Sequence, residues 1–217
     1  MVDIIIVKYS KIPNETVRRL PIYLRGLSLL SQQGVKRVSS RKLADIVSLN
    51  ADQIRKDFSF FGDFGTRGVG YEIELLTKQI KKILKLDTRH GVAMVGVGNL
   101  GQAVLAYPGF KTYGFEIAAA FDSDPAKVGK KIKNITVEDT SRVNGLIKRG
   151  IDMAIIAVPA QAAQEVTDLL VMAGIKGVLN FSSKRITVPK NVKVITIDIA
   201  TDLARLPYYM PSSQGKD

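Results

Sequence analysis

Apolar positions recur with a helical period in the first part of the chain and in short continuous runs in the second. Residues 14–32 carry an apolar side chain every three or four positions, which predicts an amphipathic helix. A shorter helix is expected to begin at Ser40, and a third helix to cover residues 51–60. Asn50, followed three positions later by Gln53, resembles a capping box at the start of this third helix.

The third predicted helix separates into an apolar and a polar face. The stripe that would pack inward carries Ile54, Phe58 and Phe61, and the opposite stripe carries Asp52, Arg55, Lys56 and Ser59. Three short helices whose third presents a basic face predict a helix-turn-helix, with that helix in the major groove of DNA. Arg55 and Lys56 can reach guanine edges or phosphates there, and Ser59 adds a hydrogen-bonding group.

A glycine-rich segment over residues 62–71 follows the third helix. Its composition predicts a β-hairpin, which would be the wing of a winged helix-turn-helix domain. Arg67 lies near the tip, where it can enter a minor groove. The pattern leaves open the alternative that the segment is a structural hairpin on a helical protein-interaction domain.

Strands alternate with helices in the second part, which a helix over residues 74–86 joins to the first. Apolar runs predict strands at residues 92–95, 116–121, 153–158, 178–180 and 194–197, and the segments between them are interpreted as helices or short turns. These strands are apolar throughout, as a sheet covered on both faces requires. The pattern predicts an α/β domain of the Rossmann type, with a doubly wound parallel sheet.

Positive charge is concentrated in the first part of the chain. Residues 1–86 carry 16 Lys and Arg against 8 Asp and Glu (+8), and residues 87–217 carry 16 against 12 (+4). Such an excess is typical of a module that binds nucleic acid, although a basic surface of no specific function explains the charge alone equally well. We expect a DNA-binding domain over residues 1–86, a Rossmann domain over 87–199 and a C-terminal segment over 200–217.

The first predicted turn from strand to helix carries a phosphate-binding motif. Its sequence is Gly96-Val97-Gly98-Asn99-Leu100-Gly101, and the amides that open the following helix can hold a pyrophosphate. Asp122 ends the next predicted strand, where a carboxylate accepts hydrogen bonds from ribose hydroxyls and repels a 2′-phosphate. The motif therefore predicts binding of NADH or NAD+ over their 2′-phosphorylated forms. The alternatives are glycines that serve only close packing, and an aspartate that caps a turn.

Composition excludes several classes of site. The chain has no cysteine, so disulfides and thiol metal sites are excluded and any redox response needs a bound small molecule. The single histidine, His90, gives no reason to expect a metal site. No apolar run approaches the roughly 18 residues of a membrane span. We therefore expect a cytoplasmic protein that does not enter a membrane.

Taken together, these residues resemble the Rex family of NADH-responsive transcriptional repressors, over about residues 13–206. The most specific matches are residues 54–59 (Ile-Arg-Lys-Asp-Phe-Ser), 61–71, 96–101, 107–110, 121–125, 158–159 and 179–181. The resemblance implies a homodimer that binds an inverted-repeat operator in double-stranded DNA when it is empty or holds NAD+. It also implies that NADH releases the protein from that operator.

The resemblance assigns further site residues. Val158, Pro159, Asn180 and Phe181 would lie on the nicotinamide side of the cofactor. Tyr107 and Asp198 match a tyrosine and an aspartate of the family's switch, whose contact the reduced nicotinamide breaks, and Arg25 matches an arginine that links this aspartate to the DNA-binding domain. Tyr107 and Asp198 have a simpler alternative, in which they cover the core and end a strand.

The tail departs from the family. After Ile199 the family continues into a helix that is exchanged between subunits, but Pro207 interrupts this segment and only a shorter helix is expected here.

Two other functions stay open. One is an NAD-dependent oxidoreductase with an accessory helical domain, although no acid–base group or substrate domain is evident, so we expect a protein that is not an enzyme. The other is a regulator that binds a different adenine nucleotide.

Overall fold

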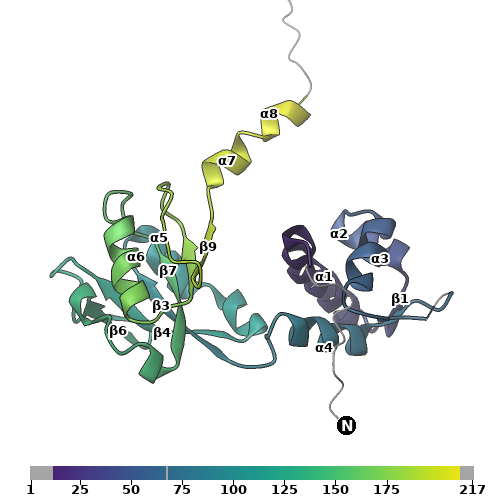
Figure 1. Ribbon diagram of the computed structural model, residues 1–217, viewed down its shortest axis with the longest axis horizontal. Helices are drawn as coiled ribbons and strands as arrows, with labels where there is room; N and C mark the ends of the chain where they lie inside the picture. Colours follow the sequence, from purple (N-terminus) through teal and green to yellow (C-terminus); the bar gives the residue numbers. More distant parts are fainter. Residues whose placement is uncertain (1–11, 67, 211–217) are drawn as a thin grey trace, which may run out of the picture. The chain divides into compact units, whose positions relative to one another are not determined.

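The computed structural model describes residues 12–66 and 68–210, and the chain divides into two compact units between Thr88 and Arg89 (Figure 1). The elements of the first unit are α1 (Asn14–Gln32), β1 (Arg37–Val38), α2 (Ser40–Val47), α3 (Ala51–Ser59), β2 (Tyr71–Glu72) and α4 (Ile73–Ile83). Leu20, Leu24 and Leu27 of α1 are buried, as the helical period predicts. The first unit is therefore the predicted helix-turn-helix with a small antiparallel ribbon.

Helix α3 begins at a cap that differs from the predicted one. The Asn50 side chain accepts a hydrogen bond from the Asp52 amide at 2.7 Å, so Asn50 does cap the helix. Gln53, however, donates its side-chain amide to Asp57 at 2.9 Å. The predicted capping box is therefore wrong, because a buried carboxylate one turn further along takes the Gln53 side chain.

The glycine-rich segment closes differently from a simple hairpin. Thr66 and Gly70 form an isolated antiparallel bridge, and β2 pairs with β1, which precedes α2, and not with a strand from the segment itself. Gly70 has a φ of +87°, and a β-carbon there would lie 2.5 Å from the Val38 carbonyl oxygen. The glycine therefore allows the wing segment to cross closely over β1.

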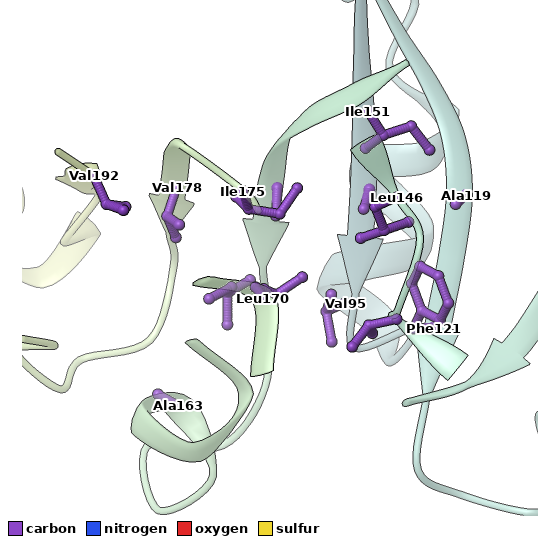
Figure 2. Close-up of a cluster of buried hydrophobic side chains, with 14 of the residues drawn as sticks. Val95, Ala119, Phe121, Leu146, Ile151, Ala163, Leu170, Ile175, Val178 and Val192 are labelled. Carbon is purple, nitrogen blue, oxygen red and sulfur yellow. The ribbon is translucent and has the colours of Figure 1, made fainter. Parts of the chain in front are cut away.

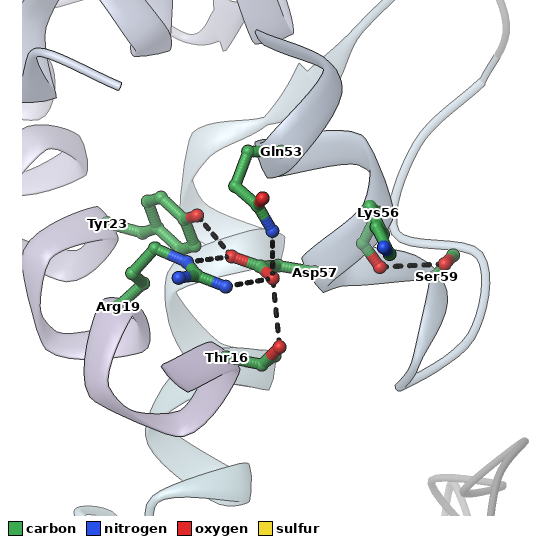
Figure 3. Close-up of polar contacts among 7 residues, drawn as sticks. All are labelled: Thr16, Arg19, Tyr23, Gln53, Lys56, Asp57 and Ser59. Atoms are coloured by element: carbon green, nitrogen blue, oxygen red, sulfur yellow. Dashed lines mark hydrogen bonds and ion pairs between the residues drawn. The ribbon is translucent and has the colours of Figure 1, made fainter. Parts of the chain in front are cut away.

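A buried carboxylate joins α3 to α1. Asp57 is 0% exposed, and Figure 3 shows its side chain directed at residues of α1. Its oxygens accept five hydrogen bonds, from Thr16 (2.9 Å), Arg19 (2.6 and 2.8 Å), Tyr23 (2.5 Å) and Gln53 (2.9 Å). Burial by itself would raise the pKa of the Asp57 carboxyl, but these donors outweigh it and hold the pKa below its ordinary value.

The second unit is built on a seven-stranded sheet in the order β5-β6-β4-β3-β7-β8-β9. Its strands are β3 (His90–Val95), β4 (Phe115–Asp122), β5 (Lys131–Ile132), β6 (Ile135–Asp139), β7 (Ile151–Ile156), β8 (Gly177–Asn180) and β9 (Lys193–Thr196). Every neighbouring pair is parallel except β5 with β6. The order places β3 at the centre, with the chain winding outward on both sides, so the predicted doubly wound fold is confirmed.

Helices and short 3-10 turns cover the two faces of this sheet. They are α5 (Asn99–Ala106), η1 (Pro108–Tyr113), η2 (Thr140–Arg142), η3 (Ile147–Arg149) and α6 (Ala163–Met172). Leu105 of α5 packs on one face with Met94 and Ile155. Leu170 of α6 packs on the other with the residues of Figure 2, among them Phe121. The two helices therefore lie on opposite faces, as right-handed crossovers in opposite directions require.

The segment between β4 and β7 was predicted as helix or short turns, and this is wrong. It contains β5 and β6, which extend the sheet beyond β4. Ile135–Asp139 has few apolar residues because it lies next to the sheet's edge and buries only Val137 well. A short polar strand of this kind lacks the continuous apolar run by which the central strands are recognised.

The C-terminal segment forms two short helices where one was expected. They are α7 (Ile199–Leu203) and α8 (Leu206–Tyr209), and Pro207 stands at the start of the second. The Asp198 carboxylate caps α7 by accepting hydrogen bonds from the amides of Ala200 and Thr201. Large apolar side chains of this segment are exposed: Ile199, Leu203, Leu206, Tyr208, Tyr209 and Met210.

Replacing Asp57 by alanine is expected to destabilise the first unit. The change leaves the Arg19 guanidinium and the hydroxyls of Thr16 and Tyr23 without their carboxylate, and removing one partner of a buried ion pair costs about 3–5 kcal/mol. The free energy of unfolding from urea denaturation, followed by circular dichroism, measures this loss. Asp52→Ala on the exposed face of α3 is the matched control, with an expected loss below about 1 kcal/mol.

The same carboxylate makes stability depend on pH. Because the pKa of Asp57 is lowered in the folded protein, its contribution is present above the pKa of an unfolded aspartate, about 3.9, and is lost as the pH falls through the folded value. Asp57→Asn should therefore flatten the acid limb of the stability curve below about pH 4. Equal stability of Asp57→Ala and Asp52→Ala would contradict the role assigned to the buried carboxylate.

Candidate nucleic-acid interface and nucleotide-binding site

The carboxyl ends of four parallel strands meet at one edge of the sheet. Backbone hydrogen bonds continue past the strand ends: the Gly96 amide donates to Phe121, the Ala157 amide to Val95, and the Phe181 amide to Ile156. The loops after β4, β3, β7 and β8 therefore stand side by side in that order. α5 and α6 leave this edge toward opposite faces, and doubly wound folds bind their ligands at such an edge.

The three motif glycines serve different purposes. Gly96 has a φ of +90°, and a β-carbon there would lie 2.5 Å from the Ala157 carbonyl oxygen. At Gly101 a β-carbon would lie 1.9 Å from the Gly96 carbonyl oxygen. At Gly98 a β-carbon would meet no atom within 4 Å, and Gly98 is the residue that precedes α5. Packing of the chain on itself accounts for Gly96 and Gly101, whereas Gly98 faces open space, as the approach of a phosphate group to the backbone requires.

Asp122 lies at the end of β4, beside this loop. Asp122 is 7% exposed, and its carboxylate accepts hydrogen bonds from the Val97 amide at 2.7 Å and the Asp124 amide at 2.9 Å. The Lys127 ammonium donates to it at 3.2 Å. Burial would raise the pKa of the Asp122 carboxyl, but the two amides and Lys127 hold the pKa below its ordinary value. The group is therefore an ionised acceptor joined directly to the glycine loop.

The residues after β7 and β8 lie on the other side of the glycine loop from Asp122. The Val158 side chain packs beside Gly96, and Pro159 is exposed. Asn180 is buried, and its side chain accepts hydrogen bonds from the Ser182 amide and hydroxyl and donates to the Lys184 carbonyl. Asn180 therefore shapes the loop that carries Phe181.

The polar face of α3 is exposed, as the sequence predicts. Arg55, Lys56 and Ser59 are exposed, while Ile54 and Phe58 are buried. Figure 3 shows Lys56 and Ser59 on the side of α3 away from the Asp57 cluster, with the Ser59 hydroxyl donating to the Lys56 carbonyl at 2.7 Å. The Arg55 guanidinium donates to the Ser40 hydroxyl at 2.7 Å and pairs with Asp52. The predicted Arg67 lies outside the described residues.

The three residues assigned to a switch lie on separate elements. Arg25 is exposed on α1 of the first unit. In the second unit Tyr107 follows α5, is 61% exposed and packs edge-on against Phe110, with ring centroids 5.3 Å apart. Tyr107 also borders an apolar hollow of about 520 Å³ over β3, β7 and β8. Asp198 caps α7.

Sequence reasoning missed two charged groups that the structure brings to these sites. Asp57 occupies an inward position of α3, and Lys127 follows Asp122 by five positions. An acidic residue within the apolar stripe of α3 was the available signal for the first.

Over residues 12–66 and 68–210 no cluster of acidic or histidine side chains is placed to bind a metal ion. Within the same residues no helix is long and apolar enough to cross a membrane.

Two family models match separate parts of the chain. Residues 11–59 match a model described as "Putative DNA-binding protein N-terminus", and residues 87–184 match a model described as "CoA binding domain". The chain is 47% identical over 203 residues to the redox-sensing transcriptional repressor Rex of Chloroflexus aurantiacus, covering 93% of this chain and 96% of that protein. It is 42% identical to the Rex repressor of Streptomyces coelicolor, covering 95% of this chain and 80% of that one.

Solved structures agree with the sequence relatives. The structure of RSP in complex with β-NAD+ and operator DNA matches 93% of each chain at a TM-score of 0.86 and 38% identity. RSP in complex with β-NADH matches 93% of this chain and 95% of that one at a TM-score of 0.83 and 36% identity. RSP is described as a Rex-family repressor. With relatives this similar over nearly its whole length, the chain belongs to the Rex family of redox-sensing transcriptional repressors.

Proposed function

We propose that this protein is a repressor that binds an operator in double-stranded DNA and leaves it when NADH replaces NAD+. One observation carries the proposal: a single chain presents both an exposed basic helix face and a glycine loop that opens a helix, and over 93% of its length it matches a repressor solved with NAD+ and operator DNA. The related structure with NADH supports the second part of the proposal, the response to NADH. The protein binds the dinucleotide as a signal and does not turn it over.

Residues 1–86 are the DNA-binding domain. In this proposal α3 enters the major groove, Arg55 and Lys56 contact bases or phosphates, and Ser59 donates or accepts a hydrogen bond at their side. Ser40 and Asp52 hold the Arg55 guanidinium in one orientation before DNA arrives. Arg67 on the wing contacts a minor groove.

Residues 87–199 are the nucleotide-binding domain. The amides of Gly98, Asn99, Leu100 and Gly101, beside Gly96, receive the pyrophosphate at the start of α5, and Val97, whose amide donates to Asp122, holds the loop in place. Asp122 accepts a hydrogen bond from the adenosine ribose. Val158, Pro159 and Phe181 lie beside the nicotinamide, and Asn180 positions Phe181. The bound dinucleotide supplies the signal, because its nicotinamide ring is cationic when oxidised and neutral when reduced.

Residues 200–217 are a dimerisation segment, and the working form is a cytoplasmic homodimer. The exposed apolar side chains of α7 and α8 support this assignment, because a second subunit would remove them from water. In this dimer Asp198 of one subunit meets Tyr107 of the other, and Arg25 ties the aspartate to α1. A neutral nicotinamide enters the pocket and breaks the contact.

NADH is expected to weaken operator binding, and NAD+ is not. Fluorescence polarisation of a labelled inverted-repeat duplex at constant ionic strength measures the apparent Kd with each nucleotide, because salt alone changes such affinities strongly. Allosteric coupling typically changes affinity by about 5- to 150-fold, and an NADH effect in this range is expected. Coenzyme A, added as a control for the second family model, should leave the Kd unchanged. An identical effect of NADH and NAD+ would reject the sensor.

Replacing Lys56 by alanine should remove specific operator binding while NADH still binds. Loss of one base or phosphate contact from the recognition helix lowers operator affinity by about 10- to 100-fold. Lys78→Ala is the matched control, since Lys78 is an exposed lysine on α4 outside the proposed interface. Equal operator affinities for the two variants would remove Lys56 from the interface.

Asp198→Asn is expected to uncouple the two sites. Asparagine caps a helix as well as aspartate, so α7 should keep its start while the negative charge is lost. Polarisation should give operator binding that NADH no longer reverses, and NADH fluorescence should still report nucleotide binding. A full NADH response in this variant would exclude Asp198 from the switch.

A further inference from the structure

Lys127 lies in the turns after β4, at the place where the adenosine ribose is proposed to bind. Its ammonium is 3.2 Å from one carboxylate oxygen of Asp122 and 3.6 Å from an oxygen of Asp124. The Lys127 side chain is 36% exposed, so the cation reaches solvent. Neither the sequence pattern nor the proposed function gives this lysine a role.

The two oxygens of Asp122 face different neighbours. Oδ1 accepts from the Asp124 amide, and Oδ2 accepts from both the Val97 amide of the glycine loop and the Lys127 ammonium. The cation therefore sits on the side of the carboxylate that faces the loop. A carboxylate has about four acceptor positions, so three donors leave about one position for a ribose hydroxyl.

The charges in this cluster do not cancel. Asp122 and Asp124 contribute −2 and Lys127 contributes +1, which leaves −1. A 2′-phosphate entering here would meet a net negative charge although an ammonium is within reach. If one carboxylate were neutral, the same ammonium could form a charge-assisted hydrogen bond with that phosphate.

We propose that Lys127 is a masked phosphate-binding residue, and that Asp122 and Asp124 together withhold it from the 2′-phosphate of NADP(H). Selectivity for the unphosphorylated dinucleotide is then set by a cluster of three charges and not by Asp122 alone. The inference rests on the proposed binding of NADH beside the glycine loop. It identifies Lys127 as the residue that would bind the 2′-phosphate of NADP(H) if Asp122 or Asp124 were neutral.

Titration of the full-length protein with NADH and NADPH, followed by nucleotide fluorescence or calorimetry, tests the inference. Asp122→Asn should raise the affinity for NADPH relative to NADH by about 10- to 100-fold, the range of one hydrogen bond to a charged group. Adding Lys127→Ala to this variant should abolish the gain. Adenosine 2′,5′-bisphosphate compared with 5′-AMP should give the same pattern, since these probes carry only the adenosine half.

A second pair of variants does not alter the proposed ribose ligand. Asp124→Asn should also raise the affinity for NADPH relative to NADH. Adding Lys127→Ala to that variant should cancel the gain. In the otherwise unchanged protein, Lys127→Ala should lower the affinity for NADPH relative to NADH. Lys130→Ala, which removes an exposed lysine three residues further on, should not change this relative affinity.

The outcomes separate this inference from the proposed function. If NADPH affinity rises in Asp122→Asn and stays high after Lys127→Ala is added, Lys127 is not the phosphate ligand and the inference is wrong. It is equally wrong if neither asparagine variant shifts the preference while NADH still binds the unaltered protein. If the unaltered protein binds neither NADH nor 5′-AMP, the proposed nucleotide site itself fails.

Discussion

Both functional surfaces are organised around a carboxylate that folding removes from water. Desolvating such a group is costly unless hydrogen bonds replace those of the lost water, so each carboxylate dictates the positions of its donors. Asp57 draws donors from α1 and α3 and so fixes the orientation of the helix proposed to read DNA. Asp122 draws the Val97 amide, the Asp124 amide and Lys127, and so joins the end of β4 to the glycine loop.

The two carboxylates differ in what they leave for a partner. Asp57 has no exposed surface and faces away from Lys56, so its effect on DNA passes entirely through the direction of α3. Asp122 keeps a small exposed fraction beside the glycine loop, where the dinucleotide is proposed to bind. One buried charge thus orients the groups proposed to bind DNA, and the other belongs to the proposed nucleotide site itself. The same physical requirement accounts for both.

Sequence periodicity predicted what depends on neighbouring residues. The apolar stripe of α3, the central strands and the glycine motif all arise from spacings of a few positions, and the structure has each of them. The Asp57 cluster was missed because its partners on α1 lie 34 to 41 positions away. Gln53 was assigned to the helix cap from its spacing to Asn50, but its side-chain amide donates to Asp57, four positions further on. Strands β5 and β6 were missed because one lies at the edge of the sheet and the other beside it, with few apolar residues. Lys127 has no distinctive local pattern.

The open space at Gly98 has a consequence for how relatives of this chain are interpreted. Gly96 and Gly101 are required by contacts within the chain, so any descendant that keeps the fold must keep them, whether or not it still binds a dinucleotide. Only the middle glycine is free to change once the ligand is lost. A relative with a larger residue at that single position, and with both outer glycines intact, would mark a lineage that retained the architecture after it had abandoned redox control.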